Sequence, residues 1–374
     1  MTDPAELSLA PVLPDLAGGC VANLVPALLG PKGTAALPGW FPRTVDGARQ
    51  VVLFVLDGVG WHQLCTRGAV APTLAALDGG PITTVAPSTT ATALTSIATG
   101  LQPGEHGIVG YRFPVRNEIL NTLRWSTPAG DARNRIVPHH TQPVPAFLGA
   151  SVPVVTRAEF ATSGFSGAHL NGARHKGYRT TSTLVVEVRR LLAAGERFVY
   201  VYYDGMDKVA HEYGFGEHYD AELAFVDRLV ADVRGLLPAD AALLVTADHG
   251  QVHVGDAVRL LDVSVVALLS HQSGEGRFRW LHARPGAAAD LEAAARAAHG
   301  DEAWVVGVDD VLAQHWFGTT VTPAARARLG DVALVARGPV SFDDSADGGA
   351  FDLVCRHGSL TADEMLVPLL AGRR

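Results

Sequence analysis

Three short apolar runs stand out along the chain, because each stops abruptly at or just before an acidic residue. The runs cover 50–56, directly before Asp57; 198–203, directly before Asp204; and 242–246, which Ala247 separates from the pair Asp248 and His249. The runs are rich in β-branched and aromatic residues and show no alternation with polar residues. Such runs are typical of strands that are buried on both faces, as in a parallel sheet.

Helical patterns lie between these predicted strands, notably over 182–194 and 221–236. Strands that alternate with helices predict an α/β fold with a doubly wound, mostly parallel central sheet and helices on both faces. We interpret residues 1–374 as a single α/β domain. Two stretches are read as additions to the sheet: a loop insertion over about 108–180, and a small inserted cap over about 255–335 with a helix over 287–299.

Ligands of doubly wound sheets bind at the carboxyl ends of the strands, where these acidic residues lie. A single Asp after a strand is more often a helix cap or a turn residue than a catalytic group. Three strand ends that carry Asp, one of them followed directly by His, make that structural interpretation less satisfactory. These strand ends therefore indicate a candidate site.

A hydroxyl-rich segment, Pro87-Ser88-Thr89-Thr90, precedes a helical pattern that ends at Gly100. Hydroxyl groups at a helix N-terminus face unpaired backbone N–H groups and the positive end of the helix dipole, which favour an alkoxide and a phosphate alike. Simple helix capping is the competing explanation, and on this segment alone it is the stronger one.

Further carboxyl and imidazole groups occur at spacings that suit metal binding. Asp207 and His211 are four residues apart, so on a helix both side chains share a face and can hold one ion. Asp248 and His249 can be aimed together at a second ion, and His357 lies near the end of the chain. With 15 His in the chain, chance adjacency competes with each assignment, but the whole set suits two metal ions with open positions.

Composition limits the possible functions. The chain has 374 residues, 48% of them hydrophobic, which is enough for a full core. A formal net charge of -8 argues against binding to a nucleic-acid polymer, whereas a small phosphorylated substrate stays possible because bound metal would reverse the local charge. Three cysteines without a CxxC pair indicate neither a disulfide framework nor a cysteine zinc site. The first residues form no signal-peptide pattern and no window is long enough to span a membrane, so a cytoplasmic location without membrane association is expected.

In their order along the chain, these motifs resemble the alkaline phosphatase superfamily, specifically its nucleotide pyrophosphatase/phosphodiesterase branch. The resemblance runs from the strand before Asp57 through Thr-Gly-Leu-x-Pro-x-x-His-Gly-Ile-Val-Gly over 99–110. It continues with 207–214, with Ala-Asp-His-Gly over 247–250, and with His357-Gly358. It spans about residues 50–370 and implies an alkaline phosphatase-like fold and a metal-dependent phosphodiesterase or nucleotide pyrophosphatase.

The resemblance also implies roles for individual residues. The Pro-Ser-x-Thr motif of the branch falls on 87–90, which makes Thr90 the nucleophile of a phospho-threonine intermediate that water then hydrolyses. One metal would be held by Asp207, His211 and His357; the other would be held by Asp57, Asp248 and His249, with the Thr90 oxygen as a further ligand. Asp204 competes with Asp207 and is disfavoured, because it lies seven residues before His211. Zinc is the expected metal, and manganese or iron would also suit these ligands.

The sequence departs from the branch directly after the nucleophile. Phosphodiesterase members usually carry Phe-Pro-Asn-His there, where this chain has Ala-Thr-Ala-Leu over 91–94. An aromatic residue for stacking on a nucleobase and an amide donor for a phosphate oxygen are both missing, which puts nucleotide specificity in doubt.

Alternatives remain open at this point. A phosphomonoesterase or a phosphonate hydrolase would use the same centre. An additional cation near Thr90 would favour monoesters, with Arg112, Arg124 and Lys176 as the loop cations to examine, whereas an apolar groove would favour diesters. A metal-binding protein without catalysis is the rival from another class. His62, His106 and His253 lie near the motifs and are expected outside the ligand set. The sequence does not predict the oligomeric state.

Overall fold

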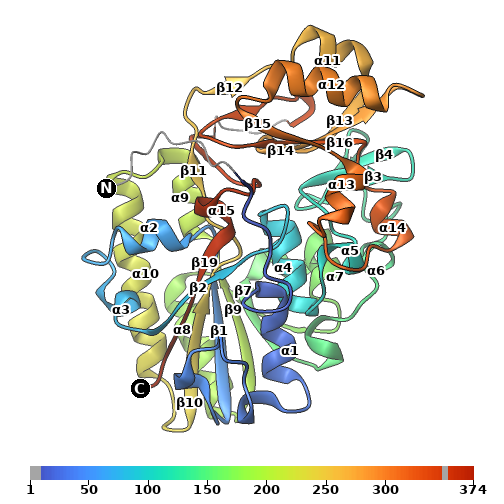
Figure 1. Cartoon of the computed structure of the whole chain (residues 1–374). Coiled ribbons are helices and arrows are strands. Elements are labelled where there is room, and N and C mark those ends of the chain that lie inside the picture. The colour runs from blue at the N-terminus through green and yellow to red at the C-terminus, as the bar shows by residue number, and fades with distance from the viewer. Residues whose placement is uncertain (1–9, 348–352) are drawn as a thin grey trace.

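The computed structural model describes residues 10–347 and 353–374. Its main element is a seven-stranded sheet of order β2-β19-β10-β1-β9-β7-β8 (Figure 1). The strands are β1 (Gln50–Leu56), β2 (Asp78–Thr83), β7 (Pro153–Arg157), β8 (Arg174–Tyr178), β9 (Phe198–Tyr203), β10 (Ala241–Thr246) and β19 (Leu366–Gly372). β10, β1, β9, β7 and β8 run parallel to one another, and β19 runs antiparallel to both of its neighbours.

The three strands predicted from apolar runs form the centre of this sheet. β1 pairs with β10 on one side and β9 on the other, and β9 and β10 are buried along their whole length. Burial on both faces explains why these strands lack polar alternation.

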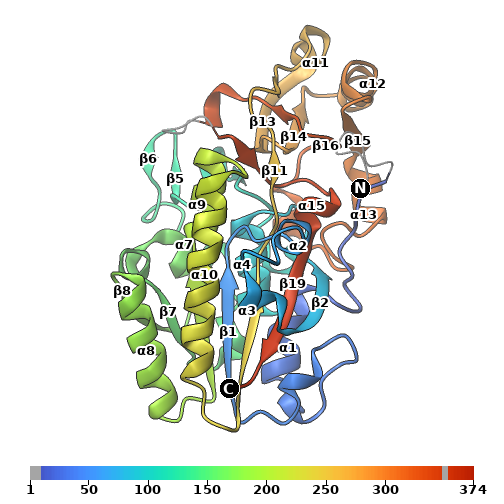
Figure 2. The same ribbon diagram turned by 90° about the vertical axis from the view of Figure 1, so that its left-hand side faces the viewer.

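Helices cover both faces of the sheet (Figures 1 and 2). One face carries α1 (Leu24–Leu29), α4 (Thr90–Thr99) and α7 (Gly164–His169), which contact one another through α4. The other carries α3 (Pro72–Ala75), α8 (Thr181–Ala193), α9 (Gly205–Tyr213) and α10 (Glu217–Gly235). The predicted doubly wound, mostly parallel α/β fold is confirmed, and the helices predicted over 182–194 and 221–236 are observed as α8 and α10 with shifted ends.

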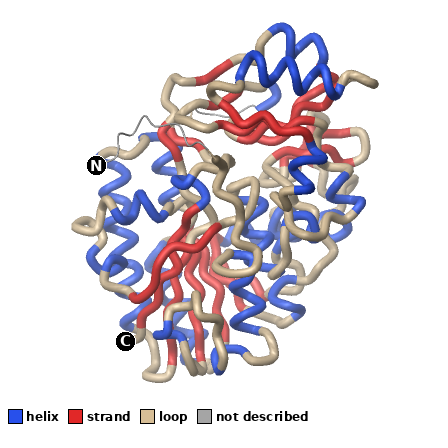
Figure 3. The backbone as a smooth tube through the Cα atoms, viewed as in Figure 1, coloured by secondary structure: helices blue, strands red, loops and turns tan. Residues whose placement is uncertain are grey.

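A second, four-stranded sheet lies beyond the carboxyl ends of the central strands, at the top of Figure 1 and in red in Figure 3. Its order is β13-β14-β16-β15, from β13 (Leu269–Glu275), β14 (Phe278–Ala283), β15 (Ala303–Gly307) and β16 (Val332–Ala336). α11 (Val263–Leu268) and α12 (Ala288–His299) pack together against it, around a small core that includes Val265, Leu281 and Leu291. We call this sheet with its two helices the upper unit.

The stretch expected as a loop insertion over about 108–180 differs from that expectation in its second half. Only its first part stands apart, as a small antiparallel sheet of β3 (Arg112–Val115), β4 (Glu118–Asn121), β5 (Ser126–Thr127) and β6 (Gly130–Asp131). β7 and β8 instead extend the central sheet at its edge. The strands were missed because both are short and β8, Arg-His-Lys-Gly-Tyr, is polar and largely exposed, as edge strands often are.

The remaining elements are short and connect these layers. They include α2 (Trp61–Cys65), α5 (Pro103–His106), α6 (Pro138–Thr141), α13 (Val308–Ala313), α14 (Pro323–Arg326), α15 (Ala362–Met365), β11 (Val252–His253), β12 (Val258–Arg259), β17 (Ser341–Phe342) and β18 (Cys355–Arg356). None of the helices in the described part of the chain has the length and apolar character that crossing a membrane requires. Residues 1–9, part of the region where no signal peptide is expected, lie outside the described residues.

Candidate metal centre

The centre forms where the neighbouring strands β1 and β10 end. Asp57 directly follows β1, and Asp248 and His249 follow β10. Since the two strands are parallel and paired in register, their carboxyl ends meet, and the backbone N–H of Gly58 donates to Asp248 Oδ1 at 3.1 Å. His249 Nε2 lies 3.4 Å from Asp57 Oδ1 and 3.5 Å from Asp248 Oδ2.

A second part of the centre comes from α9, which begins where β9 ends. Asp207 and His211 lie one turn apart on this helix, with His211 Nε2 3.2 Å from Asp207 Oδ1. The i, i+4 spacing therefore puts both side chains on one face, as the sequence predicts.

Thr90 is the first residue of α4, and its Oγ1 atom lies 3.0 Å from Nε2 of His249. Its two neighbours face elsewhere: the Ser88 hydroxyl donates to the backbone oxygen of Ser359 at 2.6 Å, and Thr89 lies beside the carboxyl of Glu275. α4 ends at Gly100, whose φ of 72° is a left-handed conformation that glycine adopts without strain. Of the three hydroxyls, Thr90 is the one that faces the centre.

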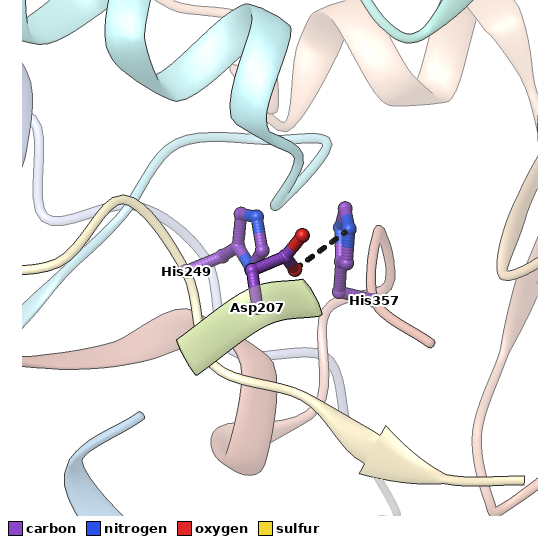
Figure 4. Close-up of side chains that lie close together, drawn as sticks. All are labelled: Asp207, His249 and His357. Carbon is purple, nitrogen blue, oxygen red and sulfur yellow. Dashed lines mark ion pairs between the residues drawn. The ribbon is translucent and has the colours of Figure 1, made fainter. Parts of the chain in front are cut away.

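His357 reaches the same place from the C-terminal segment. It follows β18, and its imidazole stacks on that of His249 with ring centroids 3.7 Å apart. Its Nε2 lies 3.8 Å from Asp207 Oδ1, the contact drawn in Figure 4. A β-bridge between Ser88 and Gly358 ties this segment to the loop before α4. All seven residues predicted for the site are thus brought together from five separate parts of the chain.

Two groups of three side chains have ligand atoms within 4.8 Å of one another. One group is Asp57, Asp248 and His249, which is the second ligand set expected from the sequence. The other contains Asp207 and His357 together with His249, whereas the sequence analysis placed His211 with them. His211 stays next to Asp207, and His249 lies between the two groups.

The three histidines share one hydrogen-bonding arrangement. Each Nδ1 contacts a backbone carbonyl oxygen: Gly250 for His249 at 3.0 Å, Cys355 for His211 at 2.6 Å, and Ser88 for His357 at 3.1 Å. A carbonyl oxygen can only accept, so each Nδ1 carries a proton, and in the neutral imidazole each Nε2 keeps a lone pair. The three lone pairs point toward carboxylates, which is the arrangement of histidines that bind a metal ion.

The carboxylates need compensation by positive charge. Burial raises the pKa of Asp57 well above its usual value, and the charges of Asp248 and Asp207 add to the effect; burial also raises the pKa of Asp248. Asp57 Oδ1 and Asp248 Oδ2 are buried without a hydrogen-bond partner among the described residues. The ion pairs of these two carboxylates and Asp207 within the described chain are all with histidines. The residues therefore fit bound divalent cations.

Three side chains that support the centre were not predicted. The Tyr202 hydroxyl donates to Asp57 Oδ2, and Gln251 Nε2 donates to Asp207 Oδ1 at 2.7 Å. Glu275, from the upper unit, lies 3.8 Å from His357 Nδ1, and burial raises its pKa to about 8. Tyr202 and Gln251 each lie within five residues of a predicted ligand, but nothing in the sequence distinguishes Glu275 from other acidic residues in turns.

Asp204, the competitor of Asp207, is engaged elsewhere. It forms ion pairs with Arg157 Nε at 2.8 Å and with Lys208 Nζ at 2.5 Å. Two cations already neutralise this carboxylate, so it is less available to a metal ion than Asp207.

The other singled-out residues lie outside the ligand groups. Arg112 is buried in ion pairs with Asp344 and Asp347, while Arg124 and Lys176 are exposed. His62 pairs with Asp363 and His253 is exposed. His106 is buried, with Nε2 2.9 Å from the Ser96 hydroxyl and Nδ1 accepting from the backbone N–H of Ile108.

A cavity of about 320 Å³ adjoins the centre, and Asp57, Thr90 and Asp207 form part of its wall. Most of the remaining wall is apolar, including Leu94, Leu123 and Phe165. Among the described residues, Lys208 is the one Lys or Arg that lines this cavity. The three candidate loop cations Arg112, Arg124 and Lys176 do not reach it.

Comparison with known proteins gives a family match and structural neighbours. The model of the family described as type I phosphodiesterase/nucleotide pyrophosphatase matches residues 51–360. No sequence among the curated proteins matches the chain.

Two solved structures illustrate the shared fold. An inactive variant of murine ectonucleotide pyrophosphatase/phosphodiesterase 5 in complex with AMP has a TM-score of 0.64 and 15% identity, over 87% of this chain and 88% of that one. Phosphonoacetate hydrolase from Sinorhizobium meliloti 1021 in complex with phosphonoformate has a TM-score of 0.63 and 19% identity, over 88% and 91%.

The family predicted from the sequence motifs is therefore confirmed. The match covers the segments that supply Asp57, Thr90, Asp207, Asp248 and His357. The chain belongs to the type I phosphodiesterase/nucleotide pyrophosphatase family, and it is a hydrolase of the phosphodiesterase and pyrophosphatase type with an alkaline phosphatase-like fold.

Proposed function

We propose that the protein hydrolyses small phosphodiesters at a centre of two divalent metal ions, with Thr90 as the nucleophile. The convergence of three histidine Nε2 atoms and three carboxylates, of which Asp57 and Asp248 are fully buried, is the observation that carries this proposal. Without bound cations, these carboxylates would remain close together in a buried environment, with two oxygens unpaired. The site is therefore best explained as one built for metal ions.

The two groups of side chains, together with His211 beside Asp207, would supply the ligand atoms for the two ions. Asp57, Asp248 and His249 would hold one ion, and Asp207, His357 and His211 the other, with His249 between them. When bound, two divalent ions would supply positive charge that offsets the charge developing on the phosphoryl group. Histidine and carboxylate ligands favour zinc, with manganese or iron as alternatives.

Thr90 suits the nucleophile role because of its place at the start of a ten-residue helix. The unpaired N–H groups and the dipole of α4 favour negative charge on its oxygen and on a phosphate beside it. In the first step, a bond forms between Thr90 Oγ1 and phosphorus while the bond to the leaving oxygen breaks, and the hydroxyl proton passes to the leaving oxygen or to solvent. In the second, water attacks phosphorus, the bond to Thr90 Oγ1 breaks, and a proton from the water restores the threonine hydroxyl.

The adjoining cavity favours diesters over monoesters. A monoester carries an additional negative charge and would benefit from free cations beside Thr90. Within residues 10–347 and 353–374, Lys208 is the one Lys or Arg in the cavity wall, and it is paired with Asp204. A largely apolar wall instead suits a second organic substituent on phosphorus. The ligands named for the two structural neighbours, AMP and phosphonoformate, are likewise small phosphorus compounds and support a small substrate.

A parallel assay tests the proposal. Purified protein, metal-replete or treated with a chelator, is assayed on bis-p-nitrophenyl phosphate and on p-nitrophenyl phosphate, with Thr90→Ala alongside. We expect chelator-sensitive hydrolysis that is faster for the diester and is lost in the variant. Faster hydrolysis of the monoester would favour a phosphomonoesterase, and stoichiometric metal without hydrolysis of either compound would contradict the proposal.

A further inference from the structure

The shape and lining of the cavity beside Thr90 limit which substrates can bind, in addition to the limits set by the metal ligands. Its volume of about 320 Å³ lies at the small end of ligand pockets. Leu94 and Leu123 line it together with Phe160 and Phe165. An in-line displacement expels the leaving group on the side of phosphorus opposite Thr90 Oγ1. A cavity that Thr90 itself lines therefore suits the substituent that stays on phosphorus.

Polar atoms in the wall of this cavity lack protein partners. His169 is buried and its Nδ1 lies 2.8 Å from the Phe165 carbonyl oxygen, so Nε2 is left as an acceptor. Burial lowers the pKa of His169 to about 3, which keeps the imidazole neutral. Thr156 is 3% exposed. Neither the Thr156 hydroxyl nor His169 Nε2 has a hydrogen-bond partner within the part of the chain that the structure describes. Both residues line the cavity, so a ligand bound there can supply the missing hydrogen-bond partners.

The charges around the cavity are already balanced. Asp204 and Lys208 are paired in its wall, and Arg157 bridges Asp204 and Glu159 beside it. A carboxylate or second phosphate on the organic substituent would find no free cation there. The remaining charges in the wall are the carboxylates of the metal centre.

We infer that this cavity selects a compact, uncharged, mainly apolar substituent, of the size of one substituted aromatic ring, that carries a hydroxyl or similar donor for His169 Nε2 or Thr156. This rests on the proposed function. It makes the enzyme a diesterase for small uncharged organic groups rather than for compounds that carry a second anionic group. Leu123 and Thr156 become residues that determine specificity.

Four diesters with the same p-nitrophenolate leaving group test the inference, because the chemistry of bond cleavage is then constant. The second substituent is methyl, phenyl, 3-hydroxyphenyl or 4-carboxyphenyl. For the metal-replete wild-type protein we expect kcat/KM to be at least about tenfold higher for phenyl than for methyl, owing to the buried apolar area. The carboxylate should lower kcat/KM at least about tenfold relative to phenyl.

Two variants locate the effect in the cavity. Leu123→Trp narrows it and should lower the phenyl-to-methyl ratio of kcat/KM, whereas Leu260→Trp, at a residue that is 77% exposed in the loop between β12 and α11, should leave that ratio unchanged. Thr156→Val keeps the shape and removes the hydroxyl, so it should lower the 3-hydroxyphenyl-to-phenyl ratio by up to about tenfold.

The outcomes separate the inference from the proposed function. Hydrolysis of all four diesters at similar rates, with ratios that Leu123→Trp does not change, would overturn the inference and leave the diesterase in place. A preference for the carboxylate compound would also overturn it. Absence of hydrolysis of every diester by metal-replete protein would instead contradict the proposed function itself.

Discussion

The Thr90 hydroxyl lies 3.0 Å from Nε2 of His249, and because His249 Nδ1 carries the proton, the hydroxyl donates this hydrogen bond. The two residues are 159 positions apart in the chain. Their contact joins the start of α4 to the end of β10, and it places the hydroxyl beside the Asp57, Asp248 and His249 group. This relationship gives the first prediction.

Thr90→Ala should lower kcat for bis-p-nitrophenyl phosphate by roughly a thousandfold or more, because the attacking oxygen is removed. Thr90→Ser, which keeps the oxygen, should retain part of the activity. Thr92→Val is the matched control: its hydroxyl lies on the same helix, is buried and has no hydrogen-bond partner among the described residues. If Thr92→Val lost as much activity as Thr90→Ala, the loss in both variants would come from a disturbed helix α4 and not from removal of the nucleophile.

Asp248→Asn should abolish hydrolysis and lower the bound metal, yet leave the metal-free protein at least as stable as wild type. The amide oxygen can still accept from the backbone N–H groups of Gly58 and His249, both at 3.1 Å. The introduced amide nitrogen replaces an oxygen that has no partner, and one buried negative charge disappears. Thermal unfolding in chelator and metal analysis measure both effects. A metal-free variant with a clearly lower Tm would show that Asp248 has a structural role that this geometry does not explain.

Asp207→Asn and Asp204→Asn should differ in metal content. Asp207 faces three histidines, whereas Asp204 is neutralised by Arg157 and Lys208. We expect metal loss after the change at 207 and stoichiometric metal after the change at 204, measured by elemental analysis of dialysed protein. Equal metal loss in both variants would reopen the choice between the two carboxylates.

Tyr202→Phe should weaken metal binding and activity by about 10- to 100-fold, the usual effect of removing a group that orients a metal ligand. The Tyr202 hydroxyl donates to Asp57 Oδ2 and leaves Oδ1 free. Titration of metal into the chelator-treated variant should restore activity at higher metal concentration, with a maximal rate close to that of wild type. A loss that saturating metal does not restore would place Tyr202 in another role.

His106 should contribute to loss of stability in acid. Burial, with a further contribution from Arg328, lowers its pKa to about 3. The unfolded chain therefore binds a proton below about pH 6.5 that the folded chain does not. The free energy of unfolding should thus fall as the pH decreases from 6.5 toward 3, by about 1.4 kcal/mol per pH unit from this group. His106→Gln should make the decrease between pH 6 and 4.5 shallower in urea titrations; an unchanged slope would contradict the assignment.

The sequence by itself determined the central strands and was enough to name the candidate residues of the metal centre. Strands buried on both faces must be continuously apolar, so 50–56, 198–203 and 242–246 could be recognised without a structure. The spacing of Asp207 and His211 could be read in the same way, because an i, i+4 pair on a helix always shares a face. Local periodicity carries both kinds of information.

Only the tertiary structure decided which ligand lies next to which. His249 lies between the two groups of ligands because β10 lies beside β1, and His357 joins it through a bridge between segments about 270 residues apart. The edge strand β8 was missed because exposed strands have no strong apolar pattern. The contacts of Glu275 and the cavity beside Thr90 also depend on packing between distant elements. Periodicity reports how each element is buried, but distances between elements are set by the packing of the whole chain.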